Sequence, residues 1–246
     1  PNAWLRIISS IKNVYSAFYK QEKYKIEKNC DWLYSSKLLE RFQATIEYIE
    51  KSNNEVLKRI LNDGICLNNL FFIDSLYSTV DKLNNFLIDY EKSIKQFIGH
   101  GDLCFNNILV DQISGCIKLI DPKSYFDKET RLNGLIDPNY DLAKLNHSFK
   151  FLYDSIVNNL FSINHENNSL NLKIYAPSEY ALANKFFKEI LINENIDEDL
   201  LSKITASLFI SMLPLHIDNE NRMICFAILG TIAFKNFDLK KLIVQI

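Results

Sequence analysis

The fold is decided by a stretch that reads GHGDLCFNNILV over residues 99–110. A histidine, a carboxylate and an amide are spaced regularly in it, with Asp102 two residues after His100 and Asn107 five residues after Asp102. This spacing, His-x-Asp-Leu-x-x-x-Asn, is typical of the catalytic loop of phosphoryl-transfer enzymes. The alternative is a polar turn between a helix and a strand, in which Asp102 and Asn107 only cap backbone N–H groups.

The residues after this loop predict a β-hairpin. Two β-favouring runs, 108–110 and 117–120, are separated by a polar turn that contains Gly115. Antiparallel pairing of the two runs would return Asp121 to the side of Asn107. We therefore expect these two oxygen-bearing side chains to belong to one site.

Each of the three polar side chains has a role in phosphoryl transfer. Asp102 is expected to orient an attacking hydroxyl and to accept its proton. Asn107 and Asp121 supply hard oxygen ligands of the kind that Mg²⁺ prefers, and the phosphates of ATP would complete the shell of the ion. The sequence therefore predicts Asp102 as the catalytic base, Asn107 and Asp121 as magnesium ligands, and ATP as the phosphoryl donor.

The rest of the chain is predicted to be helical, which makes the fold class mainly α. Apolar residues recur at three- and four-residue steps through the first hundred residues and again after residue 141. The predicted helices cover residues 4–18, 38–61 with a break at residues 53–54, 76–97, 142–157, 178–192, 199–213 and 221–237. The Asn-rich segment 162–173 is expected to be an exposed loop, and the hairpin is the only β element that we predict.

Composition excludes several classes of protein. The chain has 246 residues, 48% of them hydrophobic, which is ample for a packed core. A formal net charge of −2 argues against a nucleic-acid binder held by phosphate contacts. No apolar run is long enough to predict a membrane span. The five cysteines are irregularly spaced and form no Cys-x-x-Cys pair, so we expect reduced thiols in a cytoplasmic protein.

Residues 99–150 resemble the aminoglycoside phosphotransferase and choline kinase family, in which His-Gly-Asp replaces the His-Arg-Asp of protein kinases. The stretch YDLAKL at residues 140–145 is similar to the start of the helix that follows the metal-binding loop in that family. The resemblance implies that Asp141 lies at a helix N-terminus and that His100 and Asp141 brace the catalytic loop.

The resemblance also implies an architecture, that of a single kinase-like C-terminal lobe over residues 1–246. Residues 1–98 would be a helical segment after the interlobe hinge, residues 99–127 would carry the catalytic and metal-binding loops, and residues 128–246 would form the C-terminal helices. A complete kinase also needs a β-rich N-terminal lobe with a Gly-rich loop over the phosphates. Only Gly64 precedes Gly99 here. We therefore expect the ATP lobe to lie in another part of a larger protein, and this lobe alone to be weakly active.

A narrower resemblance is to phosphotransferases from bacterial capsule or surface-polysaccharide loci, some of which are fused to a sugar nucleotidyltransferase. It rests on HGDLCFNNIL at residues 100–109, IDP at 120–122, YDLAKLNHS at 140–148 and LPLH at 213–216. This resemblance implies a small-molecule hydroxyl as the acceptor, with a sugar as one candidate. After IDP that group usually reads Arg-Gly-Ser-Phe-Gly, whereas this chain has KSYFD at residues 123–127.

Further residues have two readings each. Asp127 and Asp137 lie near the expected active face, where each could bind a cationic or polyhydroxylated substrate or be a solvated loop carboxylate. Cys104 and His100 could instead form the nucleophile and base of a hydrolase, although packing accounts for Cys104 more simply. A second alternative for the whole chain is a non-catalytic, pseudokinase-like helical binding domain.

Overall fold

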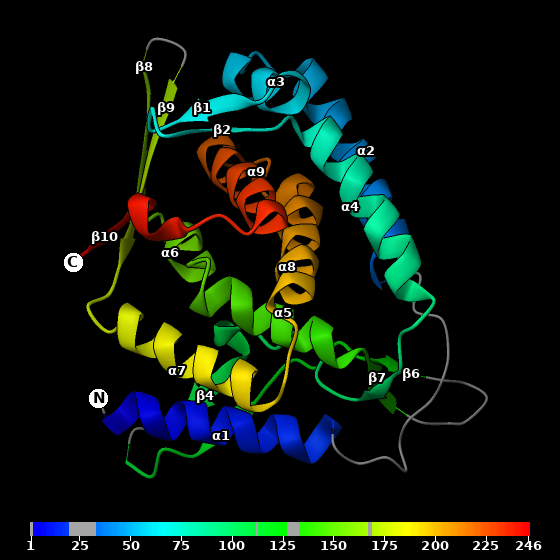
Figure 1. The fold of residues 1–246 in the computed structure, drawn as a ribbon, viewed down its shortest axis with the longest axis vertical. Coiled ribbons are helices and arrows are strands. Elements are labelled where there is room, and N and C mark those ends of the chain that lie inside the picture. The colour runs from blue at the N-terminus through cyan, green and yellow to red at the C-terminus, as the bar shows by residue number, and fades with distance from the viewer. Residues whose placement is uncertain (1, 20–32, 112, 127–132, 167–168) are drawn as a thin grey trace. The chain divides into compact units, whose positions relative to one another are not determined.

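The computed structural model describes residues 2–19, 33–111, 113–126, 133–166 and 169–246 (Figure 1). It is 59% helical, which confirms the expected mainly α class with smaller β elements. Its contacts group the chain into two compact units, each built from three separate segments. The first unit contains the described residues of 1–30, 93–150 and 177–201, and the second contains those of 31–92, 151–176 and 202–246. No helix of the described residues is both long and apolar enough to cross a membrane.

The first unit holds the stretch quoted at the outset. Its helices are α1 (Asn2–Tyr19), α5 (Pro138–Phe149), α7 (Tyr180–Asn193) and the start of α8 (Glu198–Met212). Its strands are β3 (Phe97–Ile98), β6 (Tyr125–Phe126) and β7 (Asn133–Ile136), which form one antiparallel sheet in the order β3-β7-β6, and the separate pair β4 (Ile108–Val110) and β5 (Ile117–Leu119). α1 lies alongside α7 (Figure 1).

The pair β4 and β5 is the predicted hairpin. Ile108 pairs with Leu119 and Val110 with Ile117, in antiparallel register. Gly115 turns the chain with φ +73°, a left-handed conformation that glycine adopts without steric cost. The Asp111 carboxylate accepts hydrogen bonds from the turn, which fixes its shape.

Aromatic packing attaches the catalytic-loop region to the helices of the first unit. Phe105, in the 3₁₀ turn η3 (Phe105–Asn107), packs edge-on against Phe149 of α5, with 4.7 Å between ring centroids. Phe149 also stacks on Phe187 of α7. Because such ring pairs stabilise beyond the area that they bury, this column holds the segment just before Asn107 in place.

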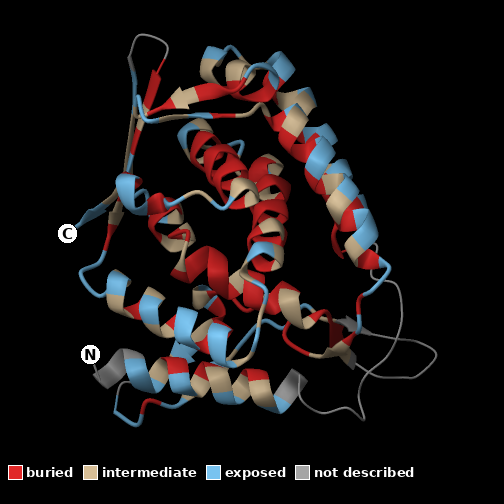
Figure 2. Ribbon diagram, in the orientation of Figure 1, coloured by how far each residue is buried: buried red, intermediate tan, exposed pale blue. Residues whose placement is uncertain are grey.

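The second unit is built around one almost fully buried helix, α9 (Glu220–Lys235). Every residue from Met223 to Ala233 is buried, as Figure 2 shows. A Cβ on Gly230 would lie 2.8 Å from the Ile210 side chain, so glycine is needed where α9 approaches α8. The other helical elements of this unit are α2 (Ser35–Lys51), α3 (Glu55–Asn62), α4 (Leu76–Glu91), α6 (Tyr153–Val157), η4 (Leu213–Leu215), η5 (Leu239–Leu242) and the rest of α8.

The second unit also contains a mixed five-stranded sheet, which the sequence did not predict. Its strands are β1 (Ile65–Leu67), β2 (Phe71–Ile73), β8 (Phe161–Glu166), β9 (Ser169–Ala176) and β10 (Ile243–Gln245). β9 pairs parallel with β1 and β10 and antiparallel with β8. The prediction that residues 162–173 form a loop is therefore wrong, and the helical segment predicted over residues 1–98 also contains β1 and β2, between the helices predicted at 38–61 and 76–97. In β9, Leu170, Leu172 and Ile174 are buried at alternate positions, a period-two pattern that the asparagines of the segment mask.

The helix boundaries follow the sequence closely except at two positions. α4 ends at Glu91 and not at residue 97, and Phe97 belongs to β3. The helix predicted over residues 142–157 is interrupted at Leu152, whose φ of +55° is left-handed. The remaining predicted helices are confirmed, and the break predicted at residues 53–54 is the N-cap of α3, where Asn54 accepts a hydrogen bond from the N–H of Leu57.

Glu91, at the last position of α4, connects that helix to the start of α2. Its buried carboxylate accepts hydrogen bonds from the backbone N–H and the hydroxyl of Ser35, at 2.7 and 2.6 Å. Ser35 is the first residue of α2, so the carboxylate satisfies a free N–H at a helix N-terminus.

We expect Glu91→Ala to lower the free energy of unfolding by about 2 kcal/mol, because a buried charged acceptor with two donors is lost. The measurement is urea denaturation followed by circular dichroism. Asp89→Ala is the matched control: Asp89 is exposed and pairs only with the exposed Lys92 among the described residues, so its removal should change stability by less than about 0.5 kcal/mol. Equal effects of the two substitutions would contradict the capping role.

Candidate active site

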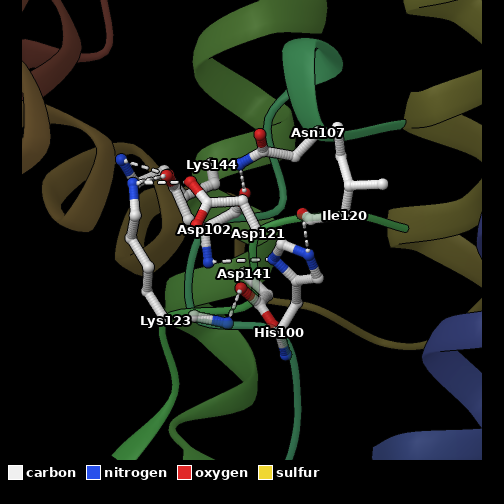
Figure 3. A network of polar contacts seen from close by, with 9 residues as sticks. His100, Asp102, Asn107, Ile120, Asp121, Lys123, Asp141 and Lys144 are labelled. Atoms are coloured by element: carbon white, nitrogen blue, oxygen red, sulfur yellow. Dashed lines mark hydrogen bonds and ion pairs between the residues drawn. The ribbon is translucent and has the colours of Figure 1, made fainter. Parts of the chain in front are cut away.

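A single carboxylate holds the backbone of the loop that carries His100 and Asp102. Asp141, buried in the first turn of α5, accepts hydrogen bonds from the N–H of His100 at 2.7 Å and from the N–H of Gly101 at 2.8 Å, one on each oxygen (Figure 3). The residue that caps α5 is Asp137, whose side chain accepts from the N–H of Asn139. Asp141 therefore lies at the helix N-terminus, as the resemblance implied, and its side chain is directed at the loop.

The ring of His100 ties the loop to the end of the hairpin. Its Nδ1 accepts a hydrogen bond from the N–H of Asp102 at 3.2 Å, and its Nε2 lies 2.9 Å from the carbonyl oxygen of Ile120. With Nδ1 as the acceptor, Nε2 is the ring nitrogen that donates to the carbonyl of Ile120. Both ring nitrogens are thus engaged with the backbone, an arrangement that leaves His100 no role as the base of a cysteine hydrolase.

Gly101 allows two loops to approach within van der Waals contact. Its φ is +81°, and a Cβ at this position would lie 2.6 Å from the backbone nitrogen of Ser124. The neighbouring Lys123 donates its backbone N–H to the carbonyl of His100 at 2.8 Å. No side chain fits here, so the His-Gly-Asp order of the motif is a steric requirement of this structure.

Asp102 is paired with two lysines. Its Oδ1 lies 3.0 Å from Nζ of Lys144, and its Oδ2 lies 3.0 Å from Nζ of Lys123 (Figure 3). Burial opposes ionisation of this carboxyl group, but the charges and hydrogen bonds of the two lysines outweigh burial and lower the pKa of Asp102 to about 2. Asp102 is therefore a carboxylate at neutral pH.

The two lysines differ in their surroundings. Lys144, on α5 three residues after Asp141, has a side chain only 14% exposed. Burial works against its charged form, but Tyr140 and Asp102 raise the pKa of Lys144 above the ordinary value. The side chain of Lys123 is 57% exposed, and its hydrogen bonds to Asp102 and Asp121 raise its pKa.

Sequence reasoning assigned no role to Lys144 and noted Lys123 only as a departure from the family pattern. The motif YDLAKL does contain one indication that Lys144 approaches this loop. Residues three apart share a helix face, so a lysine at 144 follows Asp141 toward the loop that Asp141 holds.

The structure brings Asn107 and Asp121 together as predicted. The N–H of Ile120 donates to the carbonyl of Asn107 at 3.0 Å, so the residue before Asp121 is paired with Asn107. The Asn107 side chain donates from Nδ2 to the carbonyl of Asp102 at 2.8 Å, which leaves its Oδ1 as an acceptor (Figure 3). Asp121 has a left-handed φ of +55° and a side chain 61% exposed, 3.2 Å from Nζ of Lys123.

Other residues singled out in the sequence lie elsewhere. Asp137 is buried as the cap of α5, so it does not present its carboxylate to solvent. Asp127 lies outside the described residues. Cys104 is buried. The Leu-Pro-Leu-His motif forms η4 in the second unit, where the ring of His216 packs edge-on against Phe226.

Comparisons with known proteins add no family assignment. No protein-family model matches the chain, and the search of curated proteins gives no significant match. Within the residues that the structure describes, no three His, Cys, Asp or Glu side chains are grouped as a preformed metal site. The candidate site therefore rests on its own geometry.

The ion pairs of Asp102 predict a dependence of stability on pH. Its folded-state pKa of about 2 lies below the unfolded value of about 4, so the carboxylate stabilises the fold above pH 4. That contribution is lost as the pH falls through 4 toward 2. In metal-free buffer at pH 7 we expect Asp102→Asn to lower the free energy of unfolding by about 2 kcal/mol, and the difference from the wild type to shrink toward pH 3.

Urea denaturation at pH 7, 4 and 3 provides the measurement. The exposed Asp89→Asn is the control variant, for which we expect little difference from the wild type at any of these pH values. A difference between Asp102→Asn and wild type that stayed constant from pH 7 to 3 would show that the carboxylate is not held by the two lysines.

Proposed function

We propose that this chain carries the catalytic C-terminal lobe of a kinase-like phosphotransferase. It would use ATP and magnesium to phosphorylate a hydroxyl group of a small molecule. The observation that carries the proposal is the joint placement of Asp102, Asn107 and Asp121 on one braced loop and hairpin, with Asp141 holding the loop backbone through two N–H groups.

Asp102 would act on the acceptor. A carboxylate with a pKa of about 2 is a weak base toward a free alcohol, so its main contribution would be to orient the hydroxyl by accepting its hydrogen bond. The proton would pass to Asp102 late, as the bond to phosphorus forms and the hydroxyl becomes acidic. Lys144, on the other oxygen, would keep Oδ1 fixed while Oδ2 faces the acceptor.

The residues at Asn107 and Asp121 fit a magnesium ion. The Nδ2 hydrogen bond of Asn107 leaves Oδ1 as an uncharged ligand, and the Asp121 carboxylate is exposed. The Lys123 ammonium pairs with the carboxylates of both Asp102 and Asp121, which supports the proposal that this position suits a cation. Two protein ligands suit an ion that takes the rest of its shell from water and phosphate. When bound, the ion would neutralise charge on the transferred group.

The hairpin offers an apolar face beside these ligands. Leu109 and Ile120 are 50% and 36% exposed. Leu109 pairs with Lys118, and Ile120 is two residues after Lys118, so the exposed side chains of Leu109 and Ile120 lie on the same face of the strand pair as Lys118. An exposed apolar surface next to a candidate phosphate site suits a nucleotide base, which supports ATP as the donor.

The resemblance supplies the remaining elements of the proposal. The ATP lobe would come from another part of the same protein, and the acceptor would be a sugar of capsule or surface-polysaccharide synthesis. A fused nucleotidyltransferase domain would follow from the same resemblance, since some members of that group have one, and a cytoplasmic location would suit the irregularly spaced cysteines.

One observation favours a second candidate, a non-catalytic binding domain of pseudokinase type. Both oxygens of Asp102 are already engaged by ammonium groups, so an acceptor hydroxyl would compete with a lysine for the carboxylate. The two functions differ in nucleotide binding. A catalytic lobe should be stabilised by ATP only when magnesium is present, in a thermal-shift assay with and without the upstream sequence. No shift in either form would favour the binding domain.

For the full-length protein we expect Asp102→Ala and Asp121→Ala each to lower phosphoryl transfer by roughly a thousandfold or more, because the acceptor or the metal loses its protein partner. The measurement is transfer of labelled γ-phosphate from ATP to a panel of sugars and other hydroxyl-bearing metabolites. Asp89→Ala, at an exposed position on α4, should retain wild-type activity. The assignment fails if either active-site variant keeps its activity while folded.

A further inference from the structure

Lys123 occupies an unusual position between two carboxylates. Its Nζ lies 3.0 Å from Oδ2 of Asp102 and 3.2 Å from Oδ2 of Asp121 (Figure 3). The Asp102 side chain is 15% exposed, whereas those of Lys123 and Asp121 are 57% and 61% exposed. The ammonium therefore joins a nearly buried anion to an open one.

The backbone of Lys123 is fixed while its side chain is accessible. Its N–H donates to the carbonyl of His100 at 2.8 Å, and its carbonyl carbon would lie 2.7 Å from a Cβ on Gly101. The ammonium at the end of a flexible four-carbon stem can leave a carboxylate without any movement of the loop.

The two carboxylates depend on Lys123 to different degrees. Asp102 keeps a second ammonium, that of the nearly buried Lys144 on Oδ1. For Asp121, Lys123 is the one ion-pair partner among the described residues. Departure of Lys123 from Asp121 would leave only the exposed carboxylate unpaired.

We propose that Lys123 is an exchangeable counterion and a positioning residue. Its ammonium occupies Asp121 until a divalent cation replaces it there, and it then remains near Asp102 to contact the phosphate groups that the cation binds. The inference rests on the proposed function, which makes Asp121 a metal ligand. Two cations compete for one carboxylate oxygen because their mutual repulsion offsets the attraction of the anion.

A phosphate group is the expected new partner of the ammonium. A lysine ammonium is a compact point charge with three donors, which suits oxygens of a mobile phosphoryl group. Transfer of Lys123 to phosphate would also free Oδ2 of Asp102 for the acceptor hydroxyl, so arrival of metal and phosphate would prepare the acceptor side of the site.

The first test is Mn²⁺ binding without nucleotide, measured by the electron paramagnetic resonance signal of free Mn²⁺. We expect Lys123→Met to bind Mn²⁺ about tenfold more tightly than wild type, because the competing cation is gone. Lys123→Arg should stay close to wild type. Lys118→Met is the matched control, since Lys118 is exposed on β5 and makes no ion pair among the described residues.

Asp121→Asn separates the two proposals. Loss of Mn²⁺ binding in Asp121→Asn would support the metal site. If Lys123→Met and Lys118→Met then bind Mn²⁺ equally well, the counterion role of Lys123 is overturned while the metal site stands. Absence of Mn²⁺ binding in wild type and in Lys123→Met, or binding unaffected by Asp121→Asn, would overturn the metal site and the counterion role together.

A second test addresses the phosphate contact. The probe is inorganic tripolyphosphate, titrated calorimetrically into each protein with Mn²⁺ at a concentration that saturates that protein. We expect Lys123→Met to bind it about tenfold more weakly than Lys118→Met does, because one phosphate-binding ammonium is lost. Equal affinities of the two variants would overturn the phosphate role of Lys123. Both lysines are exposed, and circular dichroism verifies that the variants fold.

Discussion

The candidate site depends on one interaction, the two hydrogen bonds that the Asp141 carboxylate accepts from the backbone N–H groups of His100 and Gly101. A buried carboxylate needs such donors, and buried backbone N–H groups need an acceptor, so each side of the contact stabilises the other. Because the acceptor belongs to the first turn of α5, the position of the loop is set by a helix. Lys144 on the same helix pairs with the side chain of Asp102. Residues 100–102 are therefore positioned by contacts with the single helix α5.

The elements that could be predicted from sequence are those with a local signal. The apolar stripes of α1, α2 and α7 have the helical period, α9 is a long continuous apolar run, and the hairpin has a turn glycine between β-favouring runs. The placement of Asn107 beside Asp121 followed from that hairpin alone, since antiparallel pairing leaves few alternatives over so short a turn.

The elements that were missed depend on contacts distant in sequence. β1 is three residues long and pairs with β9, about a hundred residues away, so neither its length nor its composition distinguishes it from a loop. Glu91 at the end of α4 accepts hydrogen bonds from Ser35 of α2, and the pKa of Asp102 is lowered by Lys144 on α5 and by Lys123. In each case the feature depends on a contact with a residue distant in sequence, which local sequence patterns do not reveal.

The contact beneath Gly101 has an evolutionary consequence. The backbone of Ser124 fills the space that a side chain at position 101 would need, so the loop that carries Asp102 and the loop that follows Asp121 are matched in shape at this point. Neither loop can change its backbone position alone. A larger residue at position 101 would fit only in a related protein in which the backbone at residues 123–124 lies farther away. Sequence variation is therefore expected in segments away from this contact, while position 101 and residues 123–124 would change together.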